Sequence, residues 1–289
     1  MVKHLKLKDV VIVIPIHKAS LSEFELLALH RVHEVLGRYD VVFFAPPSLD
    51  VSYYKGLYPN IAVTVFDPQY FGSAKRHCKL LLSATFYKRF RQYQYMLMYH
   101  LDAFVFEDRL DEWVKAGYDY VGSPWFTSFA TSHHEGHLYA VGNGGFSLRN
   151  IQSFLKVIYA YKIIQSPSEI MGSVKKINIA NRFEKAVVVL RMMFGYKNNS
   201  RYMIENYSRN EDEFWGVYAP RYFPWFKVPD VNTALKFSFE CDPAYCFAQN
   251  NNELPFGCHA WDKNDLDFWR PYILEGNQQG LTTKTRSRS

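Results

Sequence analysis

The sequence predicts a single α/β domain with a central, mostly parallel sheet flanked by helices. Apolar, β-branched runs alternate with segments of helical spacing near the start of the chain, as in 9–16, 20–36 and 39–46. Runs that are apolar at every position are typical of strands buried on both faces of a parallel sheet. The chain has 289 residues, of which 48% are hydrophobic, so it can bury such a core.

The first half is expected to follow a strand-helix-strand order. A helix is expected at 20–36, where Ser20 and Glu23 have the spacing of a capping box. The other elements expected in this half are strands at 9–16, 39–46 and 61–68 and a basic helix at 73–91.

The mostly apolar stretch 93–106, YQYMLMYHLDAFVF, predicts a central strand with His100 and Asp102 near its end. In open α/β sheets ligands bind beyond the carboxyl ends of the strands, so Asp102 is better placed for a ligand than for packing. An Asp that holds a divalent cation against a nucleotide diphosphate has this position, because hard cations prefer oxygen ligands. A buried Asp bonded to a backbone amide is the alternative.

Two later motifs carry candidate chemistry. In the first motif, NEDEFW at 210–215, Glu211 has capping-box spacing from Ser208, which lies just before the motif. This leaves Asp212 in the first helical turn, where a carboxylate can accept a proton from a hydroxyl. A solvated acidic helix start is the alternative. In PFGCHAW, His259 lies on a loop and could ligate a metal or bind a phosphate, the alternative being a loop histidine with ordinary hydrogen bonds.

Composition narrows the class of protein. The net charge of +6 favours anionic ligands such as nucleotide diphosphates, or an anionic membrane surface, and is too weak to indicate nucleic acid. The four cysteines form no CxxC pair, which argues against a zinc ribbon or a dithiol motif and favours a reducing cytoplasm. The first apolar run is too short for a signal peptide or a membrane span, so a cytoplasmic location is expected.

The segment 174–197 alternates basic and apolar residues at helical spacing. This pattern is compatible with peripheral contact with the inner face of a membrane. A helix that packs its apolar side on the sheet has the same pattern and is the simpler explanation.

The order of VIPIH, HLDAFVF, GNGGFSLR, NEDEFW and PFGCHAW resembles that of nucleotide-sugar glycosyltransferases of the GT-A fold. In particular it resembles a family of bacterial surface-polysaccharide transferases first catalogued as a domain of unknown function. The resemblance covers 9–270, and YVGSPW, GNGGFSLR and NEDEFW are its most specific parts. It implies a GT-A-like, Rossmann-like fold.

The resemblance implies roles for residues of the first half. Pro15, His17 and Lys18 would line the pocket for the nucleotide base. Asp102 would be the last residue of a DxD motif, which binds a divalent cation, Mn²⁺ or Mg²⁺, and His259 would complete the metal shell.

The second half would supply the donor sugar contact and the base. Gly144 and Gly145 would lie against the donor sugar, where a Cβ would collide with it, unless they serve only turn geometry. Glu211 and Asp212 match the acidic pair of inverting members, in which Asp212 would be the catalytic base.

One departure from the family pattern leaves metal use open. His100 stands where the first Asp of the DxD motif belongs, so Lys79, with Lys75 and Arg76, is an alternative partner for the diphosphate. Trp125 is a candidate for stacking on the sugar and equally for packing, as is Trp215.

Together these observations predict an inverting glycosyltransferase in surface polysaccharide synthesis. It would transfer a sugar from a nucleotide-sugar donor to a hydroxyl of a glycan or lipid-linked acceptor. One domain is expected at 1–275, with a nucleotide-binding half at 9–125, an acceptor and catalytic half at 141–270, and a disordered basic tail at 276–289. The alternatives are a non-catalytic carbohydrate-binding protein with this fold and a nucleotide-sugar hydrolase.

Overall fold

The computed structural model describes residues 8–127, 137–175 and 182–275, so the predicted tail lies outside the described residues. Its largest sheet has six strands, of which only β9 runs against the others. Their order across the sheet is β3 (Ala62–Val65), β2 (Asp40–Ala45), β1 (Lys8–Pro15), β4 (Tyr93–Tyr99), β9 (Phe146–Asn150) and β6 (Tyr120–Val121). Two small sheets consist of β10 (Ser238–Phe239), β11 (Gly257–His259) and β5 (Ala103–Val105), and of β7 (Ser123–Phe126) and β8 (Leu138–Gly142).

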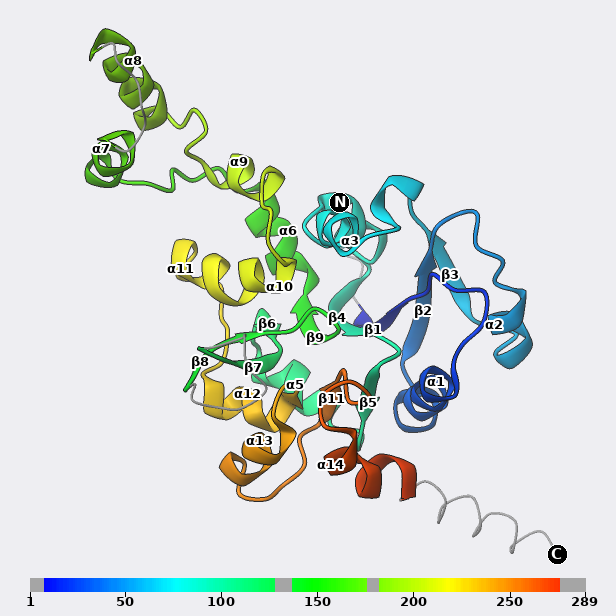
Figure 1. Ribbon diagram of the computed structural model, residues 1–289. Helices are drawn as coiled ribbons and strands as arrows, with labels where there is room; N and C mark the ends of the chain where they lie inside the picture. Colours follow the sequence, from blue (N-terminus) through cyan, green and yellow to red (C-terminus); the bar gives the residue numbers. More distant parts are fainter. Residues whose placement is uncertain (1–7, 128–136, 176–181, 276–289) are drawn as a thin grey trace, which may run out of the picture.

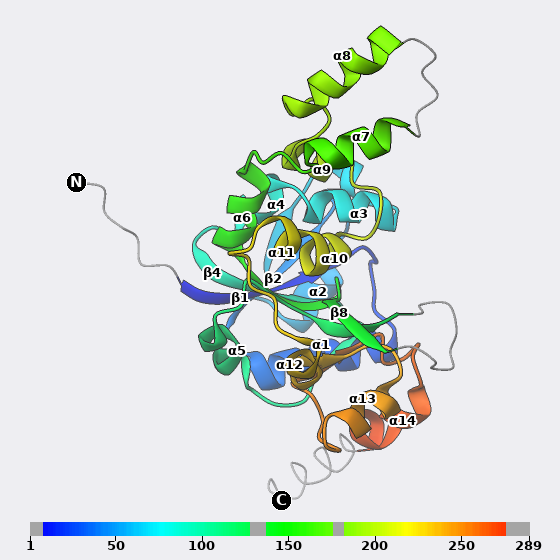
Figure 2. The same ribbon diagram turned by 90° about the vertical axis from the view of Figure 1, so that its left-hand side faces the viewer.

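Helices cover both faces of the central sheet, and others lie beyond it (Figures 1 and 2). They are α1 (Glu23–Leu36), α2 (Ser52–Leu57), α3 (Ala74–Leu81), α4 (Ala84–Arg89), α5 (Leu110–Ala116), α6 (Ile151–Tyr159), α7 (Pro167–Lys175), α8 (Arg182–Met193), α9 (Ser200–Glu205), α10 (Glu211–Glu213), α11 (Ala219–Tyr222), α12 (Val231–Phe237), α13 (Pro243–Gln249) and α14 (Leu266–Arg270), with the 3₁₀ helix η1 (Pro68–Tyr70) and the π-helical turns η2 (Phe214–Tyr218) and η3 (Pro271–Glu275). Helices α1 and α5 pack on one face of the sheet, and α3, α4 and α6 pack on the other. The predicted α/β class, with a central and mostly parallel sheet flanked by helices, is confirmed.

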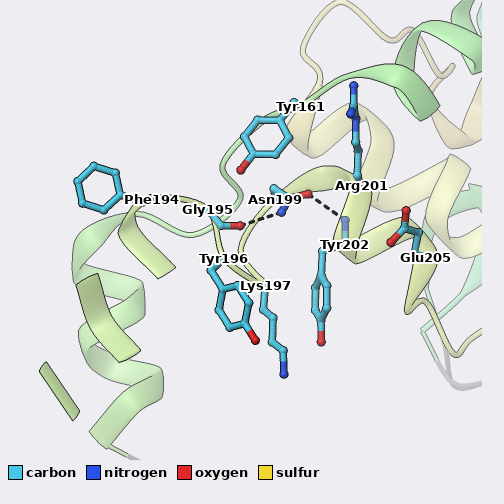
Figure 3. A pocket seen from close by; sticks show the side chains of 9 residues that line it. All are labelled: Tyr161, Phe194, Gly195, Tyr196, Lys197, Asn199, Arg201, Tyr202 and Glu205. Atoms are coloured by element: carbon cyan, nitrogen blue, oxygen red, sulfur yellow. Dashed lines mark hydrogen bonds between the residues drawn. The ribbon is translucent and has the colours of Figure 1, made fainter. Parts of the chain in front are cut away.

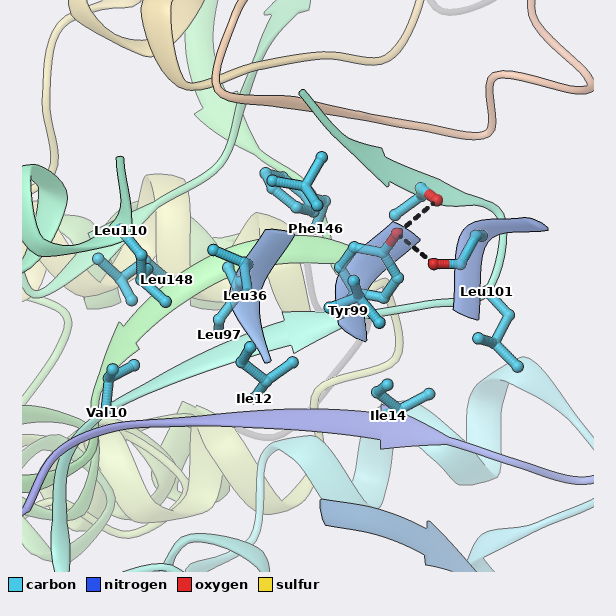
Figure 4. Close-up of a cluster of buried hydrophobic side chains, with 14 of the residues drawn as sticks. Val10, Ile12, Ile14, Leu36, Leu97, Tyr99, Leu101, Leu110, Phe146 and Leu148 are labelled. Atoms are coloured by element: carbon cyan, nitrogen blue, oxygen red, sulfur yellow. Dashed lines mark hydrogen bonds between the residues drawn. The ribbon is translucent and has the colours of Figure 1, made fainter. Parts of the chain in front are cut away.

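Burial on both faces explains the continuous apolar run of β1. Val10, Ile12 and Ile14 pack with α1 on one face, while Val11 and Val13 pack with α3 and α4 on the other. Because successive side chains of a strand point to opposite faces, every position must be apolar when both faces are covered. Figure 4 shows the first of these clusters.

A hydroxyl inside this cluster ties β4 to its surroundings. The side chain of Tyr99 is completely buried, and its hydroxyl bonds to the carbonyl oxygens of Ala28 and Ala103, each at 3.0 Å (Figure 4). The end of β4 is therefore held to α1 and to the start of β5.

Several predicted boundaries are wrong. Helix α1 is capped by Ser22 and Glu25 rather than by Ser20 and Glu23. The helix predicted at 73–91 is two helices, because the Ser83 hydroxyl caps a new one. The strand predicted at 93–106 ends at Tyr99, and the chain turns through Asp102 before β5 joins a different sheet.

A close backbone contact sets the position of α10. A Cβ on Gly216, in η2, would lie 1.7 Å from the carbonyl oxygen of Val141 in β8, so only glycine allows η2 to lie on this strand. Turn η2 directly follows α10, and π-helical turns are frequent beside functional sites. The contact therefore holds α10 against the end of the strand that precedes the GNGG motif.

Helices α7 and α8 pack against each other and project from the body of the molecule (Figures 1 and 2). Both views place α8 away from the central sheet, so the expected packing of 174–197 on the sheet is wrong for its described part. Residues 176–181 of that segment lie outside the described residues. No helix in the described ranges has the length and apolar content needed to cross a membrane.

Candidate functional site

The carboxyl ends of β1 and β4 lie side by side, because the two strands pair in parallel. His17 follows β1, and His100 and Asp102 follow β4, at the edge where open α/β sheets bind ligands. The His100 backbone N–H donates to the Gly145 carbonyl at 2.7 Å, which ties the end of β4 to the GNGG motif, residues 142–145. The structure thus brings three predicted segments to one edge of the sheet.

The pairing of β5 with β11 brings His259 to Asp102. In this antiparallel register His259 faces Ala103, the residue after Asp102. As a result, His259 Nε2 lies 3.2 Å from Asp102 Oδ1. The other ring nitrogen, Nδ1, lies 2.9 Å from Glu240 Oε1, and Lys263 Nζ lies 2.5 Å from Asp102 Oδ2.

Negative and positive side chains alternate along the series Glu240, His259, Asp102 and Lys263. Burial alone would lower the pKa of His259, but hydrogen bonds and negative charge from Asp102 and Glu240 raise that pKa to about 10. Burial alone would raise the pKa of Asp102, but hydrogen bonds and positive charge from His259, with a hydrogen bond from Lys263, hold it well below its usual range. At neutral pH a protonated His259 therefore lies between two carboxylates.

His100, Asp102 and His259 could hold a metal ion, because one ligand atom from each lies within 4.8 Å of the others. To act as a ligand, His259 would have to release its Nε2 proton to the solvent as the cation binds. Burial, with the nearby His259 and His77, lowers the pKa of His100 well below its ordinary value, so this ring is neutral and able to ligate. Its Nε2 is buried and has no hydrogen-bond partner among the described residues. Two imidazoles and one carboxylate suit Mn²⁺ and other transition ions better than Mg²⁺.

Glu211 has a different role from the one predicted. The residue that caps α10 is Asn210, without a side-chain hydrogen bond, and Glu211 is buried. Its Oε1 accepts a hydrogen bond of 3.0 Å from Arg149 Nη2, and the side chains of both residues are almost completely shielded from solvent. The predicted capping box of Ser208 and Glu211 is therefore wrong.

Asp212 lies beside the Arg149–Glu211 ion pair and has a raised pKa. Burial, strengthened by negative charge on Glu211 and Glu240, raises the pKa of Asp212 to about 8. Glu240 therefore affects both Asp212 and His259, and it links the candidate base to the candidate metal ligands. A carboxyl group with a pKa near 8 can take up and release a proton at physiological pH.

The GNGG glycines are crowded by side chains of the site. A Cβ on Gly145 would lie 2.0 Å from His259 Nε2, and one on Gly144 would lie 2.9 Å from Glu211 Oε1. Collision with His259 and Glu211 is a reason for these glycines that the sequence did not indicate, in addition to the predicted collision with a donor sugar. Contact of the Gly144 and Gly145 backbone with the donor stays a prediction.

The residues predicted for the nucleotide pocket lie at or near the same edge. Pro15 ends β1, and His17 is exposed and close enough to His77 to affect its pKa. Lys18 is held by an ion pair of 2.7 Å with Glu25. Lys79 is exposed on α3.

The two tryptophans considered for sugar stacking are packing residues. Trp125 is buried against the backbone of Gly142, where a Cβ would lie 2.1 Å from its ring. Trp215 is fully buried, and its ring stacks on Phe154 with 3.8 Å between the centroids.

Sequence reasoning missed Glu240, Lys263 and Arg149. Glu240 directly follows β10, so the argument that selected Asp102, a carboxylate after an apolar run, could have found it. Nothing in the local sequence of Lys263 or Arg149 indicates their partners, which are distant along the chain.

The model of the family described as "Protein of unknown function (DUF5672)" matches residues 60–259, more than half of the chain. No curated protein matches the chain.

Three solved structures illustrate its similarities. The apo form of the glycosyltransferase GlyE from Streptococcus pneumoniae TIGR4 matches with a TM-score of 0.43 at 10% identity. The match covers 92% of this chain and 60% of the GlyE chain, so this chain spans less than two thirds of that protein. Apo mouse xyloside xylosyltransferase 1 has a TM-score of 0.44 at 13% identity, covering 87% of this chain and 97% of its own. Core-mannan synthase A from Aspergillus fumigatus, in a Mn/GDP form, has a TM-score of 0.36 at 9% identity, covering 52% and 62%.

The buried ion pair generates a stability prediction. Glu211→Gln leaves the buried charge of Arg149 without a counter-ion, so we expect it to lower the free energy of unfolding by on the order of 3 kcal/mol in denaturant titrations. Glu213→Gln is the matched control, because Glu213 pairs with the exposed Arg209 and its loss should change stability far less. Equal, small losses in both variants would contradict a structural role for the Arg149–Glu211 pair.

Proposed function

The chain belongs to the DUF5672 family, and we propose that it is a glycosyltransferase that uses a nucleotide-sugar donor. One observation carries the proposal. A candidate cation site, His100, Asp102 and His259, shares the carboxyl edge of the sheet with Asp212, a carboxyl group whose pKa is about 8. Transfer of a sugar from a diphosphate to a hydroxyl needs a base for the hydroxyl and positive charge beside the diphosphate. A carboxyl group with a shifted pKa next to a cation site could supply both.

On the donor side, the nucleotide would lie beyond β1, in contact with Pro15, His17 and Lys18. A divalent cation bound by His100, Asp102 and His259 would stabilise negative charge on the departing diphosphate. Glu240 would orient the His259 ring, as carboxylates commonly do for ligating histidines. Without a cation, the protonated His259 and the basic side chains of α3, Lys79 among them, would be the positive groups available to the diphosphate.

On the acceptor side, Asp212 would act as general base. It would take the proton of the acceptor hydroxyl while that oxygen forms a bond to the anomeric carbon and the bond to the diphosphate breaks. Displacement from the opposite face inverts the anomeric centre. We propose that the acceptor is a glycan or a lipid-linked glycan of surface polysaccharide synthesis, with the nucleotide bound by 9–125 and the acceptor by 141–270.

The chain's own residues favour transfer over passive carbohydrate binding. Asp212 is partly buried beside Glu211 and Glu240, which opposes its ionisation, and a passive binding protein has no need of such a group. Aromatic residues, which suit sugar faces as well as cores, make up 17% of the sequence, and many of them lie in the core, as do Trp215, Trp261 and Trp269. A nucleotide-sugar hydrolase could use the same site. Added acceptor glycans would not increase its turnover, whereas they would increase the turnover of a transferase.

The direct test is to measure release of nucleoside diphosphate from a panel of nucleotide sugars with Mn²⁺, with and without acceptor glycans. We expect at least one donor to turn over, faster with acceptor, and EDTA to abolish turnover. Asp102→Asn should weaken Mn²⁺ binding in calorimetry. Asp9→Asn is the control: Asp9 is exposed near the amino end of β1, far from the carboxyl end where the site lies, so this variant should bind Mn²⁺ like the wild type. No turnover with any donor would refute the proposal, and turnover that acceptors never stimulate would favour the hydrolase.

Asp212→Asn tests the base. Asn cannot take a proton, so we expect turnover to fall by about 10²- to 10⁴-fold while the thermal shift caused by the donor is kept. In the wild type, kcat/KM should rise with pH up to about 8 and then level off, because only the ionised carboxylate acts as a base. A normal rate in Asp212→Asn would exclude this residue as the base.

The same variant should gain stability at high pH. The folded state holds the Asp212 proton more tightly than the unfolded chain does, so wild-type stability falls as the pH rises from the ordinary carboxyl range towards about 8. Asp212→Asn has no such proton, and its melting temperature should exceed that of the wild type more at pH 9 than at pH 5. A difference that does not change with pH would contradict the raised pKa.

A further inference from the structure

Residues 160–175 and 182–205, called the arm here, expose apolar side chains that form a stripe on α8 and just beyond it. Val187, Leu190 and Phe194 are 37%, 55% and 79% exposed, and Phe183 is 75% exposed. Their spacing of four, three and four residues places them on one face of a helix. Exposed apolar side chains scattered singly are ordinary, but a continuous stripe of them marks a surface that binds something.

The stripe is not part of the core. Helix α8 packs against α7, and both views show the two helices projecting beyond the rest of the molecule (Figures 1 and 2). Val188, Val189 and Met192, which are on other faces of α8, are less exposed. The helix therefore has a second apolar face in addition to the one that the fold partly covers.

The arm also carries most of the net charge of the protein. It has seven Lys or Arg and three Asp or Glu, a net charge of +4, compared with +6 for the whole chain. Basic residues beside an exposed apolar stripe form the pattern of helices that lie in the interface of an anionic bilayer.

Tyrosines and basic side chains meet at the root of the arm. A hollow of about 470 Å³ is lined there by Tyr161, Tyr196 and Tyr202 together with Lys197 and Arg201 (Figure 3). The Arg191 guanidinium also lies over the Tyr196 ring, 4.2 Å from its centroid. Tyrosine favours the headgroup level of a membrane, where its ring and its hydroxyl are both satisfied.

We infer that the arm binds the surface of an anionic lipid bilayer, with the α8 stripe entering the acyl boundary and the basic residues contacting headgroup phosphates. Charge favours this occupant over a second copy of the chain, because two arms that each carry +4 would repel one another. This surface goes beyond the proposed transfer reaction, and it would hold the site next to lipid-linked acceptors.

The test is cosedimentation with vesicles at low salt. We expect the wild type to bind vesicles that contain phosphatidylglycerol and to bind vesicles of phosphatidylcholine alone far less. Leu190→Ser with Phe194→Ser should lower the partition coefficient by about tenfold or more, since it removes apolar surface that would be buried in the bilayer. Val65→Ser with Tyr139→Ser is the matched control, because these side chains are also exposed but lie outside the arm.

Charge is tested in the same way. Lys185→Glu with Arg191→Glu should weaken binding, whereas Lys55→Glu with Lys115→Glu, the same change of charge outside the arm, should weaken it much less. Circular dichroism and melting temperature establish that each variant is folded. Absence of wild-type binding to anionic vesicles would overturn the inference, as would equal effects of arm and control variants. A dimer in light scattering that Leu190→Ser with Phe194→Ser dissociates, without vesicle binding, would assign the stripe to a second copy instead.

Discussion

Arg149 and Glu211 form an ion pair that is almost completely withdrawn from solvent, and the position of Asp212 depends on it. Arg149 on β9 also donates to the Gly144 carbonyl, to the Tyr87 hydroxyl and to the Ser147 hydroxyl, at 3.0 to 3.2 Å. One side chain thus joins the central sheet, the GNGG motif, α4 and α10. Because a buried charge without a partner is very unfavourable, α10 cannot move away from the sheet without a large loss of stability.

The electrostatics of the site follow from this packing. The negative charge of Glu211, fixed by Arg149, helps to keep the proton on Asp212, and Glu240 acts in the same direction. Glu240 also holds His259 Nδ1, which directs Nε2 towards Asp102 and the space near His100. The packing that fixes α10 therefore also sets the proton affinity of the candidate base, as expected where function is maintained at some loss of stability.

The parts of the fold that were predictable from the sequence are those that local burial determines. The apolar runs of β1 and β4 identify strands covered on both faces, and the ends of such strands indicate where His17 and Asp102 lie. The errors arise where distant contacts prevail. Glu211 has capping-box spacing from Ser208, yet it is bound to Arg149, 62 residues away along the chain. Gly145 suggests a ligand, yet the group that excludes its side chain is His259, which β11 brings from the end of the chain.

The proposed binding of a divalent cation by His100, Asp102 and His259, next to the nucleotide diphosphate, is central to the reaction proposed above. It is tested most directly by anomalous diffraction at the manganese edge, from crystals grown with Mn²⁺ and a nucleoside diphosphate. We expect one strong anomalous peak in contact with all three side chains and with the diphosphate. An ordered diphosphate at this edge of the sheet with no anomalous peak touching these residues would contradict it.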